Sequence, residues 1–142
     1  MATQAKSAYG TKIKIGDGGA PETFTEIPEV GDITGPGIEV ETEDVTTHSS
    51  AASGANREFI PTLITNSDCE FELNYVHAEP THIALRLASQ NRTKKNFQKV
   101  NPEGTETISF AGYVVGIAFA DPVDGARKFP VTIKPTGGLT FS

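Results

Sequence analysis

The stretch Cys69-Glu-Phe-Glu-Leu-Asn-Tyr75 alternates apolar and polar residues along its whole length. Successive side chains of a β-strand point to opposite faces, so this stretch places its carboxylates on one face and its apolar groups on the other. The stretch Ile38-Glu-Val-Glu-Thr-Glu-Asp44 repeats the pattern. Together the two stretches predict a β-sheet with one acidic surface.

The charges of the chain are divided into two opposed blocks. Residues 15–80 contain fourteen acidic side chains and a single basic one, Arg57, although the net charge of the whole chain is only -6. Residues 81–100 contain no acid, and their basic residues are Arg86, Arg92, Lys94, Lys95 and Lys99. Opposed blocks of this kind are typical of surfaces that repel one partner and dock another.

The remaining segments predict further short strands separated by turns. Alternating or apolar segments lie at residues 12–15, 24–30, 57–64, 96–100, 105–120 and 129–133, and turn residues lie at 16–19, 35–37, 66–68, 101–104 and 121–125. Pro28 restricts its segment to a sheet edge or a bulge. The apolar run at 110–119 is expected at the centre of the sheet. We therefore predict a mainly β protein, either an antiparallel β-sandwich or a partly closed barrel.

One short α-helix is predicted at about residues 80–91, packed on this sheet. Glu79-Pro-Thr81 is a typical helix start. The face expected to pack on the sheet carries apolar residues at helical spacing, namely Ile83, Ala84, Leu87 and Ala88. Residues 44–56, by contrast, are mostly small or polar and lack periodicity, and a loop of this length is usually functional or disordered.

Length and composition are those of one domain spanning residues 1–142. No apolar run approaches the roughly 18 residues of a membrane span, and the N-terminus lacks the apolar segment of a signal peptide. Cys69 is the sole cysteine, which is typical of a protein made in a reducing, cytoplasmic compartment. An isoelectric point of about 5.0 argues against nucleic acid as a tight ligand, because that affinity comes mainly from neutralised phosphates.

Three motifs could suggest chemistry, but each has a simpler explanation. His77, Glu79 and His82 could bind zinc, yet a deaminase-like site would also need a pair of cysteines downstream. Gly16-Asp-Gly-Gly19 lacks the Lys and Ser/Thr of a phosphate-binding loop. His48-Ser-Ser50 lies where no buried framework would hold a nucleophile and its base. We expect no metal, no cofactor and no enzymatic activity.

Read in order, several segments resemble the major tail tube proteins of long, non-contractile-tailed bacteriophages. The resemblance spans nearly the whole chain and depends on the order and number of the segments. Those segments are Gly10-Thr-Lys-Ile-Lys-Ile-Gly-Asp17, Phe24-Thr-Glu-Ile-Pro-Glu-Val30, Gly37-Ile-Glu-Val-Glu-Thr-Glu-Asp-Val-Thr-Thr47, Arg57-Glu-Phe-Ile-Pro-Thr-Leu63, Phe71-Glu-Leu-Asn-Tyr75, Pro80-Thr-His82, Phe110-Ala-Gly-Tyr-Val-Val-Gly116 and Val131-Thr-Ile-Lys-Pro-Thr-Gly137.

The resemblance implies a structural subunit of a virion tail. Hexameric rings would stack into a hollow tube around a tape-measure protein, between a tail-tip initiator and a tail terminator. Double-stranded DNA would later pass through the tube. The resemblance also implies that the chain lacks the immunoglobulin-like domain that some larger relatives append at the C-terminus.

Three groups of residues receive roles in this reading. The carboxylates expected to line the lumen and repel DNA are drawn from Glu39, Glu41, Glu43, Glu70 and Glu72. The loop expected to reach the neighbouring ring, mobile in the monomer and ordered in the tube, includes Asp44, Val45, Thr46, Thr47, His48, Ser49, Ser50, Asn56 and Arg57. The basic block at residues 86–99 is expected to face acidic patches of an adjacent subunit.

Two alternatives stay open at this point. The chain could be the tube subunit of a contractile tail or of a related secretion apparatus, which share the ring architecture. It could instead be a virion decoration module with a carbohydrate-binding β-sandwich. Such a module needs exposed aromatic residues on loops, whereas this chain has no Trp, and most Phe and Tyr residues fall at alternating strand positions where they are expected in the core.

Overall fold

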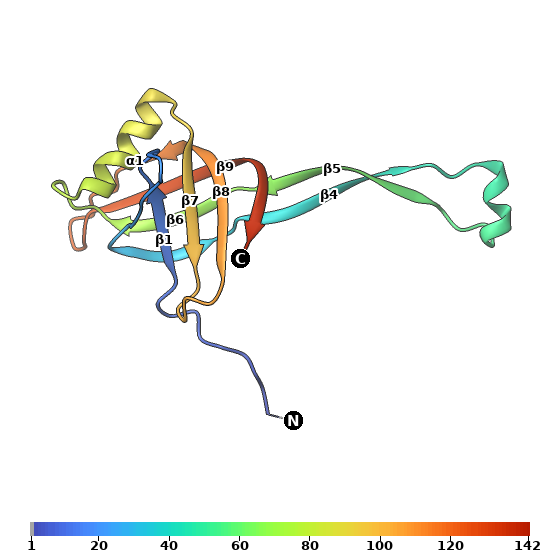
Figure 1. The fold of residues 1–142 in the computed structure, drawn as a ribbon, viewed down its shortest axis with the longest axis horizontal. Helices are drawn as coiled ribbons and strands as arrows, with labels where there is room; N and C mark the ends of the chain where they lie inside the picture. Colours follow the sequence, from blue (N-terminus) through green and yellow to red (C-terminus); the bar gives the residue numbers. More distant parts are fainter. Residues whose placement is uncertain (1) are drawn as a thin grey trace.

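The computed structural model describes residues 2–142, which form a curled β-sheet, one α-helix and a long protruding hairpin (Figure 1). The elements in chain order are β1 Lys12–Gly16, β2 Phe24–Glu26, β3 Val30–Thr34, β4 Gly37–Asp44, the 3-10 helix η1 His48–Ser53, β5 Phe59–Ser67, β6 Cys69–Asn74, α1 Pro80–Asn91, β7 Lys95–Val100, β8 Thr107–Ile117 and β9 Lys128–Phe141. The predicted strands and the predicted helix are all present, with the exceptions given below.

Seven strands form one antiparallel sheet in the order β2-β1-β7-β8-β9-β6-β3. The sheet curls into a half-barrel (Figure 1), which confirms the mainly β class and matches the partly closed barrel among the predicted layouts. One face of this sheet, the core face, carries the buried residues, which include Ile13, Phe71, Leu73, Phe97, Phe110, Phe129, Val131 and Ile133. Leu85 and Ala88 of α1 complete the same core. We call the opposite face of the sheet the outer face.

Strand alternation predicted the core face correctly in β6 and β9. Cys69, Phe71 and Leu73 are buried while Glu70 and Glu72 between them are exposed. The central position of β8 is also confirmed, since it is the fourth of seven strands. Only one of its faces is covered, however, because Tyr113 and Val115 stay 41% and 55% exposed on this subunit.

The predicted bounds of α1 are confirmed, but the predicted packing face is only partly correct: Ala84 and Ala88 pack on the core, whereas Leu87 does not. The buried residues of the helix are Thr81, His82, Leu85 and Ala88, whereas Leu87 is 46% exposed. Two hydrogen bonds hold His82 inward: its Nδ1 accepts the Val76 N–H at 3.1 Å, and its Nε2 donates to the Pro28 carbonyl at 3.0 Å. A histidine whose two ring nitrogens are both hydrogen-bonded can be buried in the core. The spacing of apolar residues alone does not predict this.

Two strand boundaries also differ from the prediction. The segment 24–30 divides into β2 and β3 around Pro28, and these are the two edge strands of the sheet, as Pro28 predicted. The turn predicted at residues 66–68 is wrong. β5 continues to Ser67 and β6 begins at Cys69, so one nearly continuous strand passes from the hairpin into the sheet. The hairpin therefore extends the β3–β6 ribbon outward.

Candidate assembly surfaces

The most prominent surface is the hairpin of β4 and β5, residues 37–67, which we call the arm. Its ladder is continuous from the pair Gly37–Ser67 to the pair Asp44–Phe59, with one bulge after Val40. The arm projects far from the sheet, and the predicted loop 44–56 forms its tip, where η1 replaces the featureless loop that we expected (Figure 1). Most residues of both strands are exposed.

The two faces of the arm differ in chemistry. Residues that oppose each other in an antiparallel pair share a face, so Val40 and Ile64 lie together, and the ladder then assigns the others by alternation. The apolar face carries Ile38, Val40, Phe59, Pro61 and Ile64, and it also includes the polar residues Thr42, Asp44 and Asn66. The acidic face carries Glu39, Glu41, Glu43, Ile60 and Leu63. The alternation at residues 38–44 is thus present, but neither face is buried within the subunit.

The apolar face of the arm is unusual for an isolated subunit. Ile38, Phe59 and Ile64 are 55%, 56% and 65% exposed. Burying such a side chain contributes about 1.5–3 kcal/mol, so a row of them left in water strongly favours contact with another surface. The arm is therefore a candidate assembly surface on physical grounds.

The tip of the arm is held by local polar contacts. Arg57 pairs with Asp44 at 2.9 Å, and the Ser50 hydroxyl donates to Glu58 at 2.7 Å. Hydrogen bonds from Thr46, and then the contact with Arg57, lower the pKa of Asp44. Ser50 thus helps to organise the tip.

Two hydrogen bonds join the base of the arm to the body. The Lys99 ammonium of β7 donates to the Gly35 carbonyl at 2.8 Å. The Asn66 amide donates to the Gly137 carbonyl at the bend of β9. Gly35 itself has a φ of 77°, and a side chain there would overlap the Asp68 carbonyl on the other strand. Only glycine fits at this close approach of the two strands.

We predict that Gly35→Ala destabilises the fold more than Gly18→Ala does. Both glycines have φ close to 78°, so both variants lose roughly 1–2 kcal/mol from the left-handed backbone. Gly18 faces open space, whereas Gly35 faces Asp68. Urea unfolding of the two variants measures the difference. Equal losses would show that the close approach at Gly35 has no structural importance.

A second candidate surface lies on the outer face at β3 and β6. Glu70 and Glu72 project there, opposite Thr132 and Pro130 of β9. Asp32 and Thr34 of β3 line the same shallow depression. Glu29 is close by, since its carboxylate accepts a hydrogen bond from Asn74 at 3.2 Å. The five predicted lumen carboxylates therefore divide between two elements: Glu70 and Glu72 on the sheet, and Glu39, Glu41 and Glu43 on the arm.

The basic block does not form one surface. Lys99 donates a hydrogen bond to the Gly35 carbonyl, and Arg86 donates one to the Tyr75 hydroxyl at 3.1 Å. Both side chains therefore make contacts within the subunit. Lys95 is half-buried on β7. Arg92 and Lys94 are exposed near the C-terminal end of α1 and are the members best placed for contact with another subunit.

Residues 2–142 contain no group of three or more His, Cys, Asp or Glu side chains placed to hold a metal ion. Both ring nitrogens of His82 are engaged within the protein, and His77 is exposed. No helix of this part of the chain is long and apolar enough to cross a membrane.

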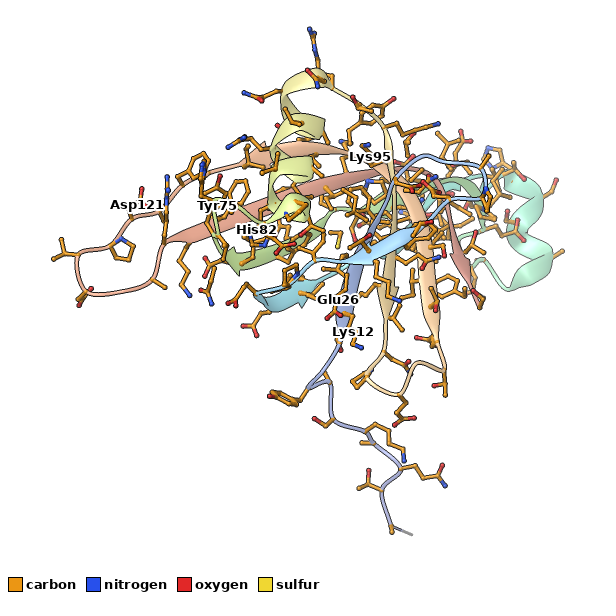
Figure 2. The ribbon with its side chains drawn as sticks, turned by 60° about the vertical axis from the view of Figure 1, so that its left-hand side comes forward. Lys12, Glu26, Tyr75, His82, Lys95 and Asp121 are labelled. Atoms are coloured by element: carbon orange, nitrogen blue, oxygen red, sulfur yellow. The ribbon has the colours of Figure 1, made fainter. Side chains whose placement is uncertain are left out.

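A third surface was missed by the sequence analysis. Tyr75, Phe119 and Arg127 pack against one another at the end of the body away from the arm tip, and Figure 2 shows Tyr75 near Asp121 at that end. We expected phenylalanines and tyrosines in the core, yet Phe119 is 45% exposed. Its position after the end of β8, beside a turn, is the signal that could have indicated an exposed ring.

Comparison with solved structures identifies the fold. A subunit in the tail of an empty gene transfer agent particle, refined with C6 symmetry, superposes with a TM-score of 0.79 at 20% identity, over 97% of this chain and 99% of that one. The SPP1 tail tube gives a TM-score of 0.69 at 14% identity, over 93% and 76% of the two chains. The chain has the tail tube fold.

The tail tube fold is shared here at low sequence identity. A chain of the sheath–tube complex of an extracellular contractile injection system, PVC, superposes with a TM-score of 0.72 at 12% identity, over 98% of this chain and 92% of that one. No protein-family model matches the sequence, and no curated protein sequence does. The similarity thus lies in the half-barrel and its arm more than in the residues that form them.

Proposed function

We propose that the chain is a structural, non-enzymatic subunit of a virion tail tube. The observation that carries the proposal is the exposed apolar face of the arm on a subunit with the tail tube fold. Six copies would form a ring, as the C6 symmetry of the gene transfer agent tail suggests, and rings would stack through their arms. The edge strands β2 and β3 would find partners in neighbouring copies.

Electron microscopy of the concentrated protein tests this proposal. Stacking driven by mass action should give hollow tubes of even width, striped at a regular interval. Monomers alone at every concentration, with or without a purified tail-tip initiator, would contradict the proposal. A tape-measure protein and a terminator are the further partners that a tube of defined length requires.

The lumen is proposed to be lined by the acidic part of the outer face, with Glu70 and Glu72 as the lining residues. DNA carries one charge per about 1.7 Å of its axis, so a carboxylate wall repels it within a Debye length of about 8 Å. Genome passage then breaks no tight contacts. Glu39, Glu41 and Glu43 of the arm lie on a different element, and we assign them to subunit contacts below.

We predict that the double variant Glu70→Lys/Glu72→Lys assembles but slows genome release. Both side chains are exposed in the subunit, so the fold should tolerate the change. Release from assembled particles can be followed with a DNA-binding dye, and the isosteric Glu70→Gln/Glu72→Gln variant separates added attraction from lost repulsion. Normal release from Lys-containing particles would remove these two residues from the lumen.

A tube subunit of a contractile system is the second candidate, because the contractile injection system tube shares the fold at a similar TM-score. The two functions differ in one partner. A contractile tube binds a sheath along its outer surface, so co-sedimentation of tubes with a sheath protein encoded nearby would favour that function.

A further inference from the structure

The aromatic surface at the far end of the body is built as a rigid patch. The Arg127 guanidinium lies 4.9 Å from the ring centre of Tyr75 and 5.2 Å from that of Phe119. The two rings meet edge to face with centres 5.2 Å apart. Phe119 also stacks on the fully buried Phe129 at 5.0 Å, so the patch rests directly on the core.

Two guanidinium groups flank the Tyr75 ring. The Nε atom of Arg127 forms an ion pair with Asp121 at 2.8 Å, and this contact holds the guanidinium over the rings. Arg86 donates through Nη1 to the Tyr75 hydroxyl. Within residues 2–142 the other nitrogens of both groups have no hydrogen-bond partner, so they can still receive carboxylates. Aromatic and arginine side chains together are enriched in the energetic centres of protein interfaces. We call Tyr75, Arg86, Phe119 and Arg127 the arginine–aromatic patch.

The acidic face of the arm matches this patch in chemistry. It offers the carboxylates of Glu39, Glu41 and Glu43 beside the apolar side chains of Ile60 and Leu63, which are 45% and 68% exposed. The patch offers guanidinium donors beside an exposed ring. Carboxylates meet guanidinium groups and apolar groups meet apolar groups, which is the pairing that favours a specific interface.

The geometry separates the two surfaces within one molecule. The arm leaves one end of the body, while the turn between β8 and β9, which carries Asp121, lies at the other end (Figures 1 and 2). A subunit cannot place its own arm on its own patch. Contact between them must join two copies head to tail, and such heterologous contacts generate rings or open stacks.

We propose that the arginine–aromatic patch of one copy receives the acidic face of the arm of a second copy. The inference rests on the proposed function, in which arms join subunits, and it names the surface that the arm contacts. This contact does not use the apolar face of the arm, which can therefore pack against another surface of the assembly.

A disulfide trap tests the contact directly. Leu63→Cys on the arm and Val123→Cys, in the exposed turn between β8 and β9, are combined in one chain. Copper–phenanthroline and air oxidise thiols that lie close together, and disulfide-linked oligomers on a denaturing gel are the expected result. Cys69 does not compete, because burial raises its pKa to about 12 and it is inaccessible. The control pair is Leu63→Cys with Glu103→Cys, in an exposed turn outside the patch.

Charge reversal provides a second readout. Arg127→Glu alone and Glu41→Arg alone should each raise the concentration needed for assembly at least about tenfold, and the two changes in one chain should restore most of it. Circular dichroism confirms that each variant is folded. Lys12→Glu, an exposed site on β1 outside the patch, is the control for net charge.

The outcomes separate this inference from the proposed function. Tubes that form normally from both single variants, without cross-linked oligomers from the Leu63→Cys/Val123→Cys chain, would overturn the inference and leave the tube function intact. A wild-type protein that never forms tubes would contradict the tube function. In that case the Leu63→Cys/Val123→Cys chain would still test the contact between arm and patch. Disulfide-linked oligomers in its concentrated solution would support the contact, and monomers alone would overturn it.

Discussion

Removing the arm is expected to abolish tube formation while the body remains folded. Ile38 and Asn66 oppose each other in the ladder, so Asn-Gly can replace residues 39–65 as a two-residue hairpin turn. The removed side chains are almost all exposed and contribute little to the core. The free energy of unfolding should therefore change by no more than about 1 kcal/mol. Electron microscopy and sedimentation should show monomers at concentrations where the full chain forms tubes.

Two features of this variant make the result informative. It keeps the hydrogen bond between Asn66 and Gly137 and the hydrogen bond between Lys99 and Gly35. The base of the arm is therefore undisturbed. Its control is the full chain with Ser49→Ala at the tip, an exposed residue whose loss should leave assembly unchanged. Tubes of normal width from the armless chain would show that the arm is dispensable and that the body surfaces alone hold the rings.

Phe129→Ala is expected to be strongly destabilising. Phe129 is fully buried on β9 opposite Leu73, stacks on Phe119 and meets the Tyr75 ring edge at 5.1 Å. Truncating a buried phenylalanine removes its transfer free energy and leaves a cavity, which together cost about 3–5 kcal/mol. A domain of this size has a stability of about 5–15 kcal/mol, so a large share of the total would be lost.

Urea unfolding of Phe129→Ala and Phe141→Ala measures this effect. Phe141 lies on the same strand and is 55% exposed, so its truncation should cost less than about 1 kcal/mol. If the two variants lost similar free energies, the core assigned to the half-barrel would be wrong. Phe129→Ala should also loosen the arginine–aromatic patch, since Phe119 rests on this ring.

Period-two alternation identified the core correctly in strands whose apolar face packs within the same subunit. In β6 and β9, Phe71, Leu73 and Val131 are buried as the pattern predicted, because these strands lie inside the sheet beside other strands. The same alternation placed Ile38 and Val40 together on one face, but the subunit does not bury that face. A pattern states which residues share a face, but it does not state whether the same molecule covers that face.

Helical spacing had a similar limit. The bounds of α1 followed from Pro80 and from the apolar residues after it. Its orientation followed from the two hydrogen bonds of His82, whose partners Val76 and Pro28 come from other parts of the chain. Local propensity cannot foresee such bonds, because they form only after the sheet has brought those backbone groups together.

The sequence by itself determined the β class, the strand alternation, the helix, the division of charge, and a resemblance that led to the tail tube fold. The strand alternation, the helix and the charge blocks depend on residues near one another in the chain, and the resemblance depends on the order of such segments. Only the tertiary structure decided that acidic residues of similar pattern lie on two elements, that Lys99 fastens the arm, and that Tyr75, Arg86, Phe119 and Arg127 meet at one end. The physical reason is that these surfaces join residues from separate elements, and the packing of the half-barrel sets their distances.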